Sequence, residues 1–333
     1  MAITLAEAQK NVQDDLQFGV IDEFRKSSWL LEHIIFDDVV SPTGGGTTMT
    51  YGYTRLKTQP TASFREVNSE YTPGEVTKER HTVDLKIFGG AYQIDRVIAS
   101  MGGIVDEVDL QTKQKVKAAQ ALFNDTFING DSATDSKAFD GLDKALTGSS
   151  TEYNGGSSDS VIDLSTSEAI TTNYMLFLDM LDEFLSGLDG TPSFLGMNSK
   201  MAAKLRACAR RATMYQTTKD DYGQNVEMYG NIPFIDLGAK AGSNDPVVSI
   251  DTADKLSDGS TANPNKGCSS IYVGRLALDG LHAVSPSGQA PIKTWLPDFK
   301  TAGAVKKGEV EMIAAIALKA SKAAGVFRKI KIQ

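Results

Sequence analysis

The chain has 333 residues, which is enough for one large domain or two of ordinary size. Hydrophobic residues make up 41% and charged residues 23%, as in globular proteins with a packed core. Aspartate and glutamate (42) outnumber lysine and arginine (34), so the formal net charge is −8. This balance argues against a protein that grips nucleic acid through many phosphate contacts, although an acidic wall can still surround DNA.

The N-terminus and the cysteines indicate a soluble protein of a reducing compartment. The first ten residues, MAITLAEAQK, lack a positive segment followed by an apolar one, so we expect no signal peptide. Uncharged apolar stretches such as 312–318 are too short to span a bilayer, so no membrane partner is expected. Cys208 and Cys268 have no paired spacing, which predicts neither a disulfide scaffold nor a zinc site.

Residues 1–46 are predicted to form an N-terminal arm that contains helix. Its more apolar part covers 18–36 and includes Trp29, and Phe36 closes that part. The run SPTGGG at 41–46 is typical of a break after such a segment.

Residues 47–57 and 81–88 are predicted to be the two strands of a long hairpin. Residues 58–80 between them are mostly polar or charged and include two prolines. Because two strands with so few apolar side chains cannot build a core, the hairpin needs a surface to lie on. That surface is either a neighbouring subunit or, as in an ordinary long hairpin, the chain's own domain. The second strand should place three apolar side chains on one face: Val83, Leu85 and Ile87.

Residues 104–129 show the strongest helical pattern of the chain. Apolar residues such as Phe123 and Phe127 recur at intervals of three and four, and the Asn129-Gly130 pair is a typical helix end. Alternating elements then indicate a compact mixed domain. Further helices are expected from Ser165 to Leu185 and from Asn198, and strands at 193–197, 232–237, 269–276, 281–284, 310–318 and 326–332.

Signatures of catalysis are missing from the sequence. It contains no GxSxG elbow, no Walker loop and no GxGxxG after a strand. His33, His81 and His282 are scattered, without the spacing of metal ligands, and Cys208 fits a helix face better as a buried apolar residue than as a nucleophile. We therefore expect no enzyme, no catalytic residue, no cofactor and no metal.

The order of the predicted elements resembles the major capsid protein family of tailed bacteriophages, with the Hong Kong 97-type shell fold. Four stretches carry the resemblance. FGGAYQIDRVIAS (88–100) is similar to the return strand of the family's extended loop, and FLGMNSKMAAKLR (194–206) to a strand-then-helix step. YGNIPFID (229–236) resembles the next short turn and strand, and IYVGRLALDGL (271–281) a late central strand.

The resemblance implies an α+β fold of four parts. They are an N-terminal arm (1–46), an extended β-hairpin loop (47–90), a peripheral domain with a long spine helix (91–138 and 301–333) and a mixed α/β axial domain (139–300).

The same resemblance implies a structural subunit that forms hexamers and pentamers of an icosahedral head around double-stranded DNA, without sequence-specific binding. Its partners would be copies of itself, a scaffolding protein, a portal and, as a further candidate, a cement protein. The head would assemble in the host bacterial cytoplasm and form part of the virion. The alternative is an encapsulin-type bacterial nanocompartment shell; a tail-tube protein and an unrecognised enzyme are weaker alternatives. The expected intersubunit contacts are Trp29, Phe36, Phe64, Arg65, Glu66, Tyr71, Glu75 and Arg80.

Two departures from the family bear on assembly. Some members begin with a long cleavable segment, whereas here the arm starts almost at Met1, so either a separate scaffold or a mature form is expected. Some members also weld subunits through lysine–asparagine bonds. Lys57, Lys78 and Lys86 lie in or beside the loop, but no asparagine follows Asn265, so the shell is expected to be non-covalent.

Overall fold

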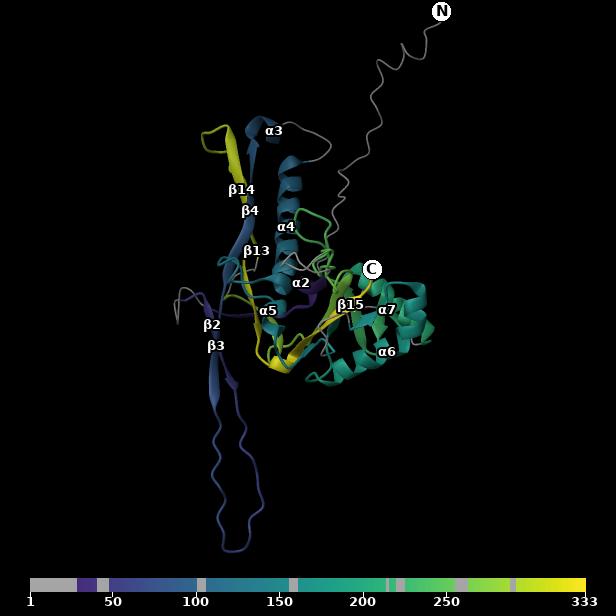
Figure 1. Cartoon of the computed structure of the whole chain (residues 1–333). Helices are drawn as coiled ribbons and strands as arrows, with labels where there is room; N and C mark the ends of the chain where they lie inside the picture. Colours follow the sequence, from purple (N-terminus) through teal and green to yellow (C-terminus); the bar gives the residue numbers. More distant parts are fainter. Residues whose placement is uncertain are drawn as a thin grey trace, which may run out of the picture.

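The computed structural model of the chain describes residues 29–40, 48–100, 106–155, 161–213, 216–219, 225–254, 263–287 and 292–333. Most of the predicted arm (1–28) and the glycine run at 44–46 lie outside these ranges. Figure 1 shows a body made of two sheets and their helices. From this body a helix-backed sheet extends in one direction and a long hairpin in the opposite one.

A five-stranded sheet is organised around one long strand. β14 (Val305–Leu318) pairs along one edge with β4 (Lys86–Asp95), in antiparallel register from Val305↔Asp95 to Ala314↔Lys86. Its other edge pairs with β13 (Ile292–Trp295) and then with β12 (Leu281–Pro286), and β1 (Phe36–Val40) adds to β12 in parallel. The long β4–β14 pair forms the extension seen in Figure 1, with α3 (Arg96–Ser100) at its end.

The spine helix α4 (Glu107–Asn129) packs along the β4–β14 pair. Asp106 caps its first turn by accepting hydrogen bonds from the amides of Val108 and Asp109, and it ends at Gly130. Phe123 is fully buried and lies 6.3 Å, ring to ring, from Phe88 of β4. The predicted helix is thus confirmed from Glu107 to Asn129, as is its stop, while residues 104 and 105 of the prediction lie outside the described ranges.

Farther along the spine, small and aromatic residues bring α4 and the sheet together. A Cβ on Gly308 of β14 would lie 2.3 Å from the ring of Tyr92, so only glycine leaves room for that ring. The Tyr92 hydroxyl in turn lies 2.7 Å from the Thr112 hydroxyl of α4. The glycine therefore sets how closely the tyrosine can join sheet and helix.

The second sheet has eight strands in the order β5-β15-β11-β7-β10-β9-β8, with β6 also pairing with β15. Helix α6 (Ser167–Ser186) and helix α7 (Ser199–Arg211) pack beside it, and the short helix α5 (Leu142–Leu146) joins it to α4. Asn198 caps α7 by accepting from the Met201 amide, as its predicted position at the helix start requires. The strand bounds are β5 Glu152–Tyr153, β6 Ile162–Asp163, β7 Phe194–Met197, β8 Gln216–Lys219, β9 Asn225–Tyr229, β10 Ile232–Asp236, β11 Cys268–Gly274 and β15 Ala324–Lys331.

Three expectations need correction. Residues 29–40 are not a free arm, because α2 (Trp29–His33) packs on the core and β1 belongs to the five-stranded sheet. The alternation at 81–88 does not form one strand face, because the strand pairing changes at the buried Leu85 and leaves Ile87 exposed. Finally, residues 301–333 divide between the two sheets, since β14 and β15 lie in different ones.

Candidate functional site: the projecting hairpin and its base

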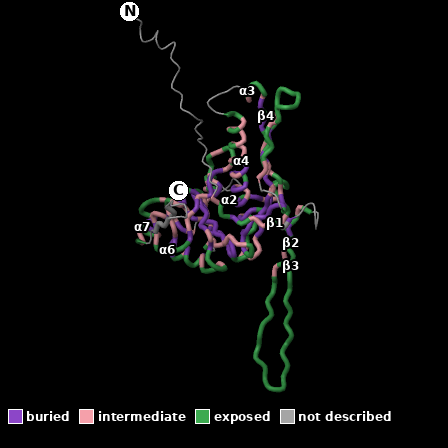
Figure 2. The backbone as a smooth tube through the Cα atoms, turned by 180° about the vertical axis from the view of Figure 1, so that it is seen from behind, coloured by how far each residue is buried: buried purple, intermediate pink, exposed green. Residues whose placement is uncertain are grey.

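The most exposed regular feature of the molecule is the hairpin of β2 (Thr50–Leu56) and β3 (Lys78–Asp84). The two strands pair antiparallel from Thr50↔Asp84 to Leu56↔Lys78. Residues 57–77 continue the projection without strand pairing. Every residue from 56 to 80 is exposed, and Figure 2 shows the resulting solvent-exposed loop standing clear of the body.

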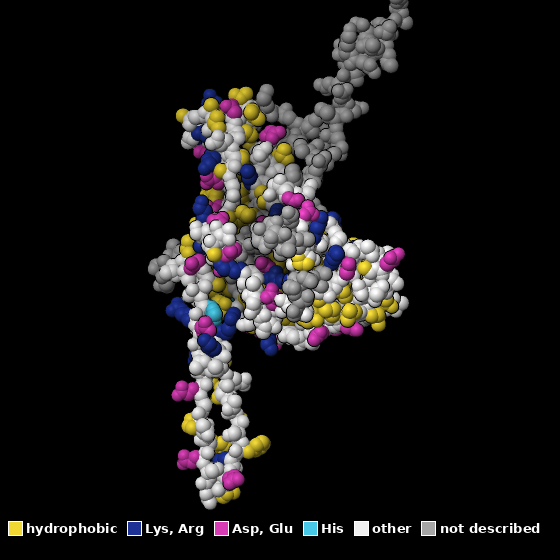
Figure 3. Space-filling model, in the orientation of Figure 1, with side chains coloured by type: hydrophobic (Ala, Val, Ile, Leu, Met, Phe, Trp, Pro, Cys, Tyr) yellow, Lys and Arg dark blue, Asp and Glu magenta, His cyan; other side chains and the backbone are white. Residues whose placement is uncertain are grey.

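Large apolar side chains lie open on this loop. Phe64 is fully exposed, Val67 is 88% exposed and Tyr71 61% exposed. Burying one such side chain is worth about 1.5–3 kcal/mol, so leaving several in water forgoes a stabilisation that a second surface can supply. Figure 3 shows apolar side chains interspersed with acidic and basic ones along the loop. A mixed apolar and charged surface that its own chain does not cover is typical of an interaction site.

The tip of the loop nevertheless has local order. Glu66 to Ser69 form a turn in which the Ser69 amide donates to the Glu66 carbonyl (3.2 Å), with Asn68 in the left-handed region (φ 70°). The guanidinium of Arg65 donates to the Ser69 carbonyl (3.0 Å) and lies 5.4 Å from the centre of the Tyr71 ring. These contacts give the tip a defined shape without burying it.

The predicted contact residues fall into two groups. The six on the loop are exposed: Phe64, Arg65, Glu66, Tyr71, Glu75 and Arg80. The two in the predicted arm instead pack on their own chain. Trp29 stacks on His33 at 4.1 Å and lies 5.9 Å from Phe194, and Phe36 lies 6.3 Å from Phe123. Their half-buried rings already contribute to the core of their own chain.

Two side chains of β2 join the hairpin to the end of β14. The Tyr53 hydroxyl donates to the Leu318 carbonyl (2.9 Å), and Arg55 donates to the carbonyls of Leu318 (2.7 Å) and Lys319 (2.9 Å). Tyr53 also stacks on His81 of β3, with ring centroids 5.5 Å apart. Sequence analysis missed this base, because the partners are backbone carbonyls some 264 residues away and carry no residue-type signal.

The third inward-facing side chain of β2, Tyr51, joins what we call the Asp37 cluster: Asp37, Tyr51, His282 and Lys319. The Tyr51 hydroxyl donates to the Asp37 carboxylate (2.9 Å). His282 Nε2 and Lys319 Nζ each lie 3.8 Å from the same carboxylate oxygen. Burial, with the hydrogen bond to Asp37, raises the pKa of Tyr51 above its usual range. Burial, helped by Lys319, lowers the pKa of the fully buried His282 to about 4.

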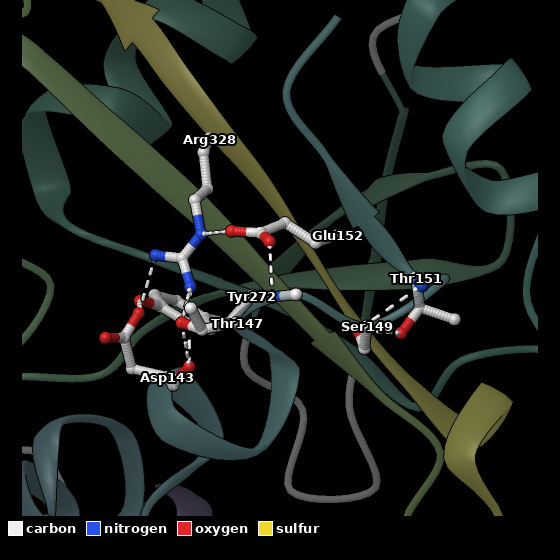
Figure 4. Close-up of polar contacts among 8 residues, drawn as sticks. Asp143, Thr147, Ser149, Thr151, Glu152, Tyr272 and Arg328 are labelled. Atoms are coloured by element: carbon white, nitrogen blue, oxygen red, sulfur yellow. Dashed lines mark hydrogen bonds and ion pairs between the residues drawn. The ribbon is translucent and has the colours of Figure 1, made fainter. Parts of the chain in front are cut away.

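A separate polar cluster fastens α5 to the eight-stranded sheet. Arg328 of β15 binds the carboxylates of Asp143 in α5 (2.6 Å) and Glu152 in β5 (2.5 Å). Tyr272 of β11 donates to the same Asp143 oxygen (2.7 Å), and Thr147 accepts from Arg328 (2.9 Å). Figure 4 shows these side chains converging on one guanidinium. All its members have partners within the cluster, so its role is to hold α5 against the eight-stranded sheet.

The described residues contain little that resembles an active site. Within them no group of three or more histidine, cysteine, aspartate or glutamate side chains is placed to hold a metal ion. Burial raises the pKa of Cys208 and of Cys268 to about 11, the opposite of what activates a thiol nucleophile. In that same part of the chain, no helix combines the length and apolarity needed to cross a lipid bilayer.

The chain has the Hong Kong 97-type shell fold, with a long hairpin, a spine helix on a long strand pair and a mixed α/β domain. Over 99% of its length it matches a chain of the holo-SrpI encapsulin complex from Synechococcus elongatus PCC 7942, covering 97% of that chain (TM-score 0.64, 13% identity). It also matches a chain from Mycobacterium phage Bobi, and the match covers 100% of both chains (TM-score 0.60, 13% identity). The capsid of a native GTA particle matches over 98% of this chain and 97% of the other (TM-score 0.56, 12% identity). No family model and no curated protein matches the sequence.

Proposed function

We propose that the chain is the major capsid subunit of a tailed bacteriophage, which assembles as hexamers and pentamers into an icosahedral head. The observation that carries the proposal is the projecting hairpin. Residues 56–80 have no cover within their own chain and expose Phe64, Val67 and Tyr71, while their base is hydrogen-bonded to a packed body. In a shell protein, the surface on which such a hairpin docks is a second copy of the chain.

A hairpin that docks on a different surface of the next copy makes a head-to-tail contact. Such contacts generate rings when the rotation between copies closes, and rings of five and six are the units of an icosahedral shell. Individually modest contacts then add up, because every subunit both offers a hairpin and receives one. No covalent weld is needed for this scheme, so denaturing gel electrophoresis of intact particles should show only the single chain.

The proposed contents are double-stranded DNA, which the shell encloses without reading its sequence. The net charge of −8 fits a wall that does not adhere to phosphates. A scaffolding protein, a portal and a cement protein are proposed as partners. Assembly in the host bacterial cytoplasm would place the chain in the capsid of the virion.

Electron microscopy of the purified protein, with and without a co-expressed phage scaffold, tests the proposal. Closed shells, or rings with five- or six-fold symmetry, are expected. A single small species even with scaffold would contradict a shell function.

A matched variant tests the role of the hairpin. Replacing residues 58–76 by Asn-Gly keeps the whole β2–β3 pair, including the hydrogen bond from the Lys57 amide to the Thr77 carbonyl, and closes it with a favoured two-residue turn. The variant should fold with unchanged circular dichroism but form no shells. Normal shells from this variant would show that the hairpin is not an assembly contact.

An encapsulin-type nanocompartment remains a second candidate, because an encapsulin shell chain shares the fold over 99% of this chain. The contents of purified particles distinguish the two. Nuclease-protected double-stranded DNA supports a phage head, and a co-purifying protein cargo without DNA supports a nanocompartment.

A further inference from the structure

His282 is an unusual residue for the centre of this fold. It lies on β12 and is fully buried, yet neither ring nitrogen makes a hydrogen bond of good geometry among the described residues, and the backbone of Gly280 is only a weak partner. Buried polar atoms are nearly always paired, so an unpaired imidazole needs an explanation. The Asp37 carboxylate lies 3.8 Å from its Nε2, which is near enough to attract a proton but too far for a hydrogen bond.

One oxygen of Asp37 serves several groups at once. It accepts the hydrogen bond of Tyr51 (2.9 Å) and lies 3.8 Å from the ammonium of Lys319. The edge of the Tyr51 ring also contacts His282, with the ring centroids 5.8 Å apart. While His282 is neutral, the Asp37 carboxylate interacts with the Tyr51 hydroxyl and the Lys319 ammonium. Both adjoin the hairpin base, because Tyr51 lies in β2 and the Lys319 carbonyl accepts from Arg55.

We propose that the Asp37 cluster is a proton-sensitive latch, in which protonation of His282 draws the carboxylate away from Tyr51 and Lys319 and loosens the base of the hairpin. A protonated ring has two donors and a positive charge, and within the cluster only the Asp37 carboxylate can satisfy them. The same charge repels Lys319, whose backbone helps to hold Arg55. The latch rests on the proposed function only for the hairpin's role as a docking element, and it frees the hairpin to change its angle in acid.

The groups that face His282 decide the pH at which the latch opens. They are Asp37 from β1, Tyr51 from β2 and Lys319 from the segment after β14. Burial and Lys319 lower the pKa of His282 to about 4, against the opposing effects of Asp37 and the backbone of Gly280. The ring is therefore neutral at pH 7, and the latch opens only in acid.

Spin labels on the full-length chain can report the hairpin angle. Ser63→Cys places one label on the loop and Lys322→Cys a second on the body, and both positions are exposed. The native Cys208 and Cys268 are buried, so the labels react with the engineered thiols. Distances are measured by pulsed electron paramagnetic resonance on the dispersed chain from pH 7.5 to pH 4, so the readout does not depend on shell formation.

The latch predicts that the distance distribution becomes about twofold broader as the pH falls, because the hairpin then samples more than one angle. In the His282→Leu background it should stay narrow throughout, and in Asp37→Asn it should be broad at every pH. His282→Gln is the second variant if the leucine disturbs folding. Equal broadening with and without His282, or no broadening in the parent at pH 4, would overturn the latch. A working latch in a chain that never forms shells would instead count against the proposed function alone.

Discussion

The hydroxyl of Tyr53 donates a 2.9 Å hydrogen bond to the backbone carbonyl of Leu318, across 265 positions of sequence. This contact joins a strand of the projecting hairpin to the last residue of the longest strand in the body. The hairpin is thus exposed from residue 56 to residue 80 but fixed at its base. These hydrogen bonds connect the base of the hairpin directly to the five-stranded sheet.

Arg55 should contribute most to this base. Arg55→Met removes two hydrogen bonds from a charged donor to the carbonyls of Leu318 and Lys319, and it should lower the free energy of unfolding by about 1–3 kcal/mol. Urea denaturation followed by circular dichroism measures the change. Lys57→Met is the control, because Lys57 is exposed and its ion pair with Glu79 is long (4.0 Å). It should change stability by less than about 0.5 kcal/mol. Equal effects of the two variants would contradict the anchoring role.

The exposed loop should be protected when subunits assemble. Trypsin should cleave after Arg65 rapidly in the dispersed chain, because the surrounding backbone is exposed and outside any strand. In assembled particles the same bond should be cleaved at least about tenfold more slowly. Mass spectrometry of the fragments follows this one bond, and Arg65→Gln should abolish the signal. The same cleavage rate in both states would mean that the loop stays free in the shell.

Arg328 should be the most sensitive residue of the polar cluster. Arg328→Met leaves the carboxylates of Asp143 and Glu152 without their shared cation, and the loss should be about 2–3 kcal/mol because the site is only partly buried. Thermal unfolding measures it. Lys331→Met is the matched control, since its ion pair with Asp163 is more exposed and longer (3.8 Å), and its effect should stay below about 1 kcal/mol. A harmless Arg328→Met would show that the cluster does not hold α5 in place.

His282 should make the fold less stable in acid. Its pKa in the folded chain is about 4, against an ordinary value of 6.5, so the unfolded chain binds more protons between these values. Stability from this group is therefore complete above pH 6.5 and is lost as the pH falls through 4, by up to about 3 kcal/mol. Because carboxylates titrate in the same range, the useful quantity is the difference in unfolding free energy between the parent and His282→Leu at each pH. A difference that does not vary with pH would contradict a lowered pKa.

Local patterns in the sequence determined many elements of this protein. Asn198 begins α7 and Gly130 ends α4 where capping chemistry predicts, and the polar composition of 58–80 already indicated a hairpin that cannot form a core by itself. These features depend on neighbouring residues, and short-range chemistry is what a sequence states most directly.

Only the tertiary structure decided the rest. Residues 29–40 belong to the core because β1 pairs with β12, which lies 247 residues away in the register Phe36↔Ala283 and Asp37↔Val284. The strand pairing changed at Leu85 because β14 captured the following residues, which no alternation of side chains announces. The hairpin base and the Asp37 cluster likewise use backbone carbonyls and one shared carboxylate from distant strands. Such partners are chosen by how the sheets pack, and this choice is absent from local spacing.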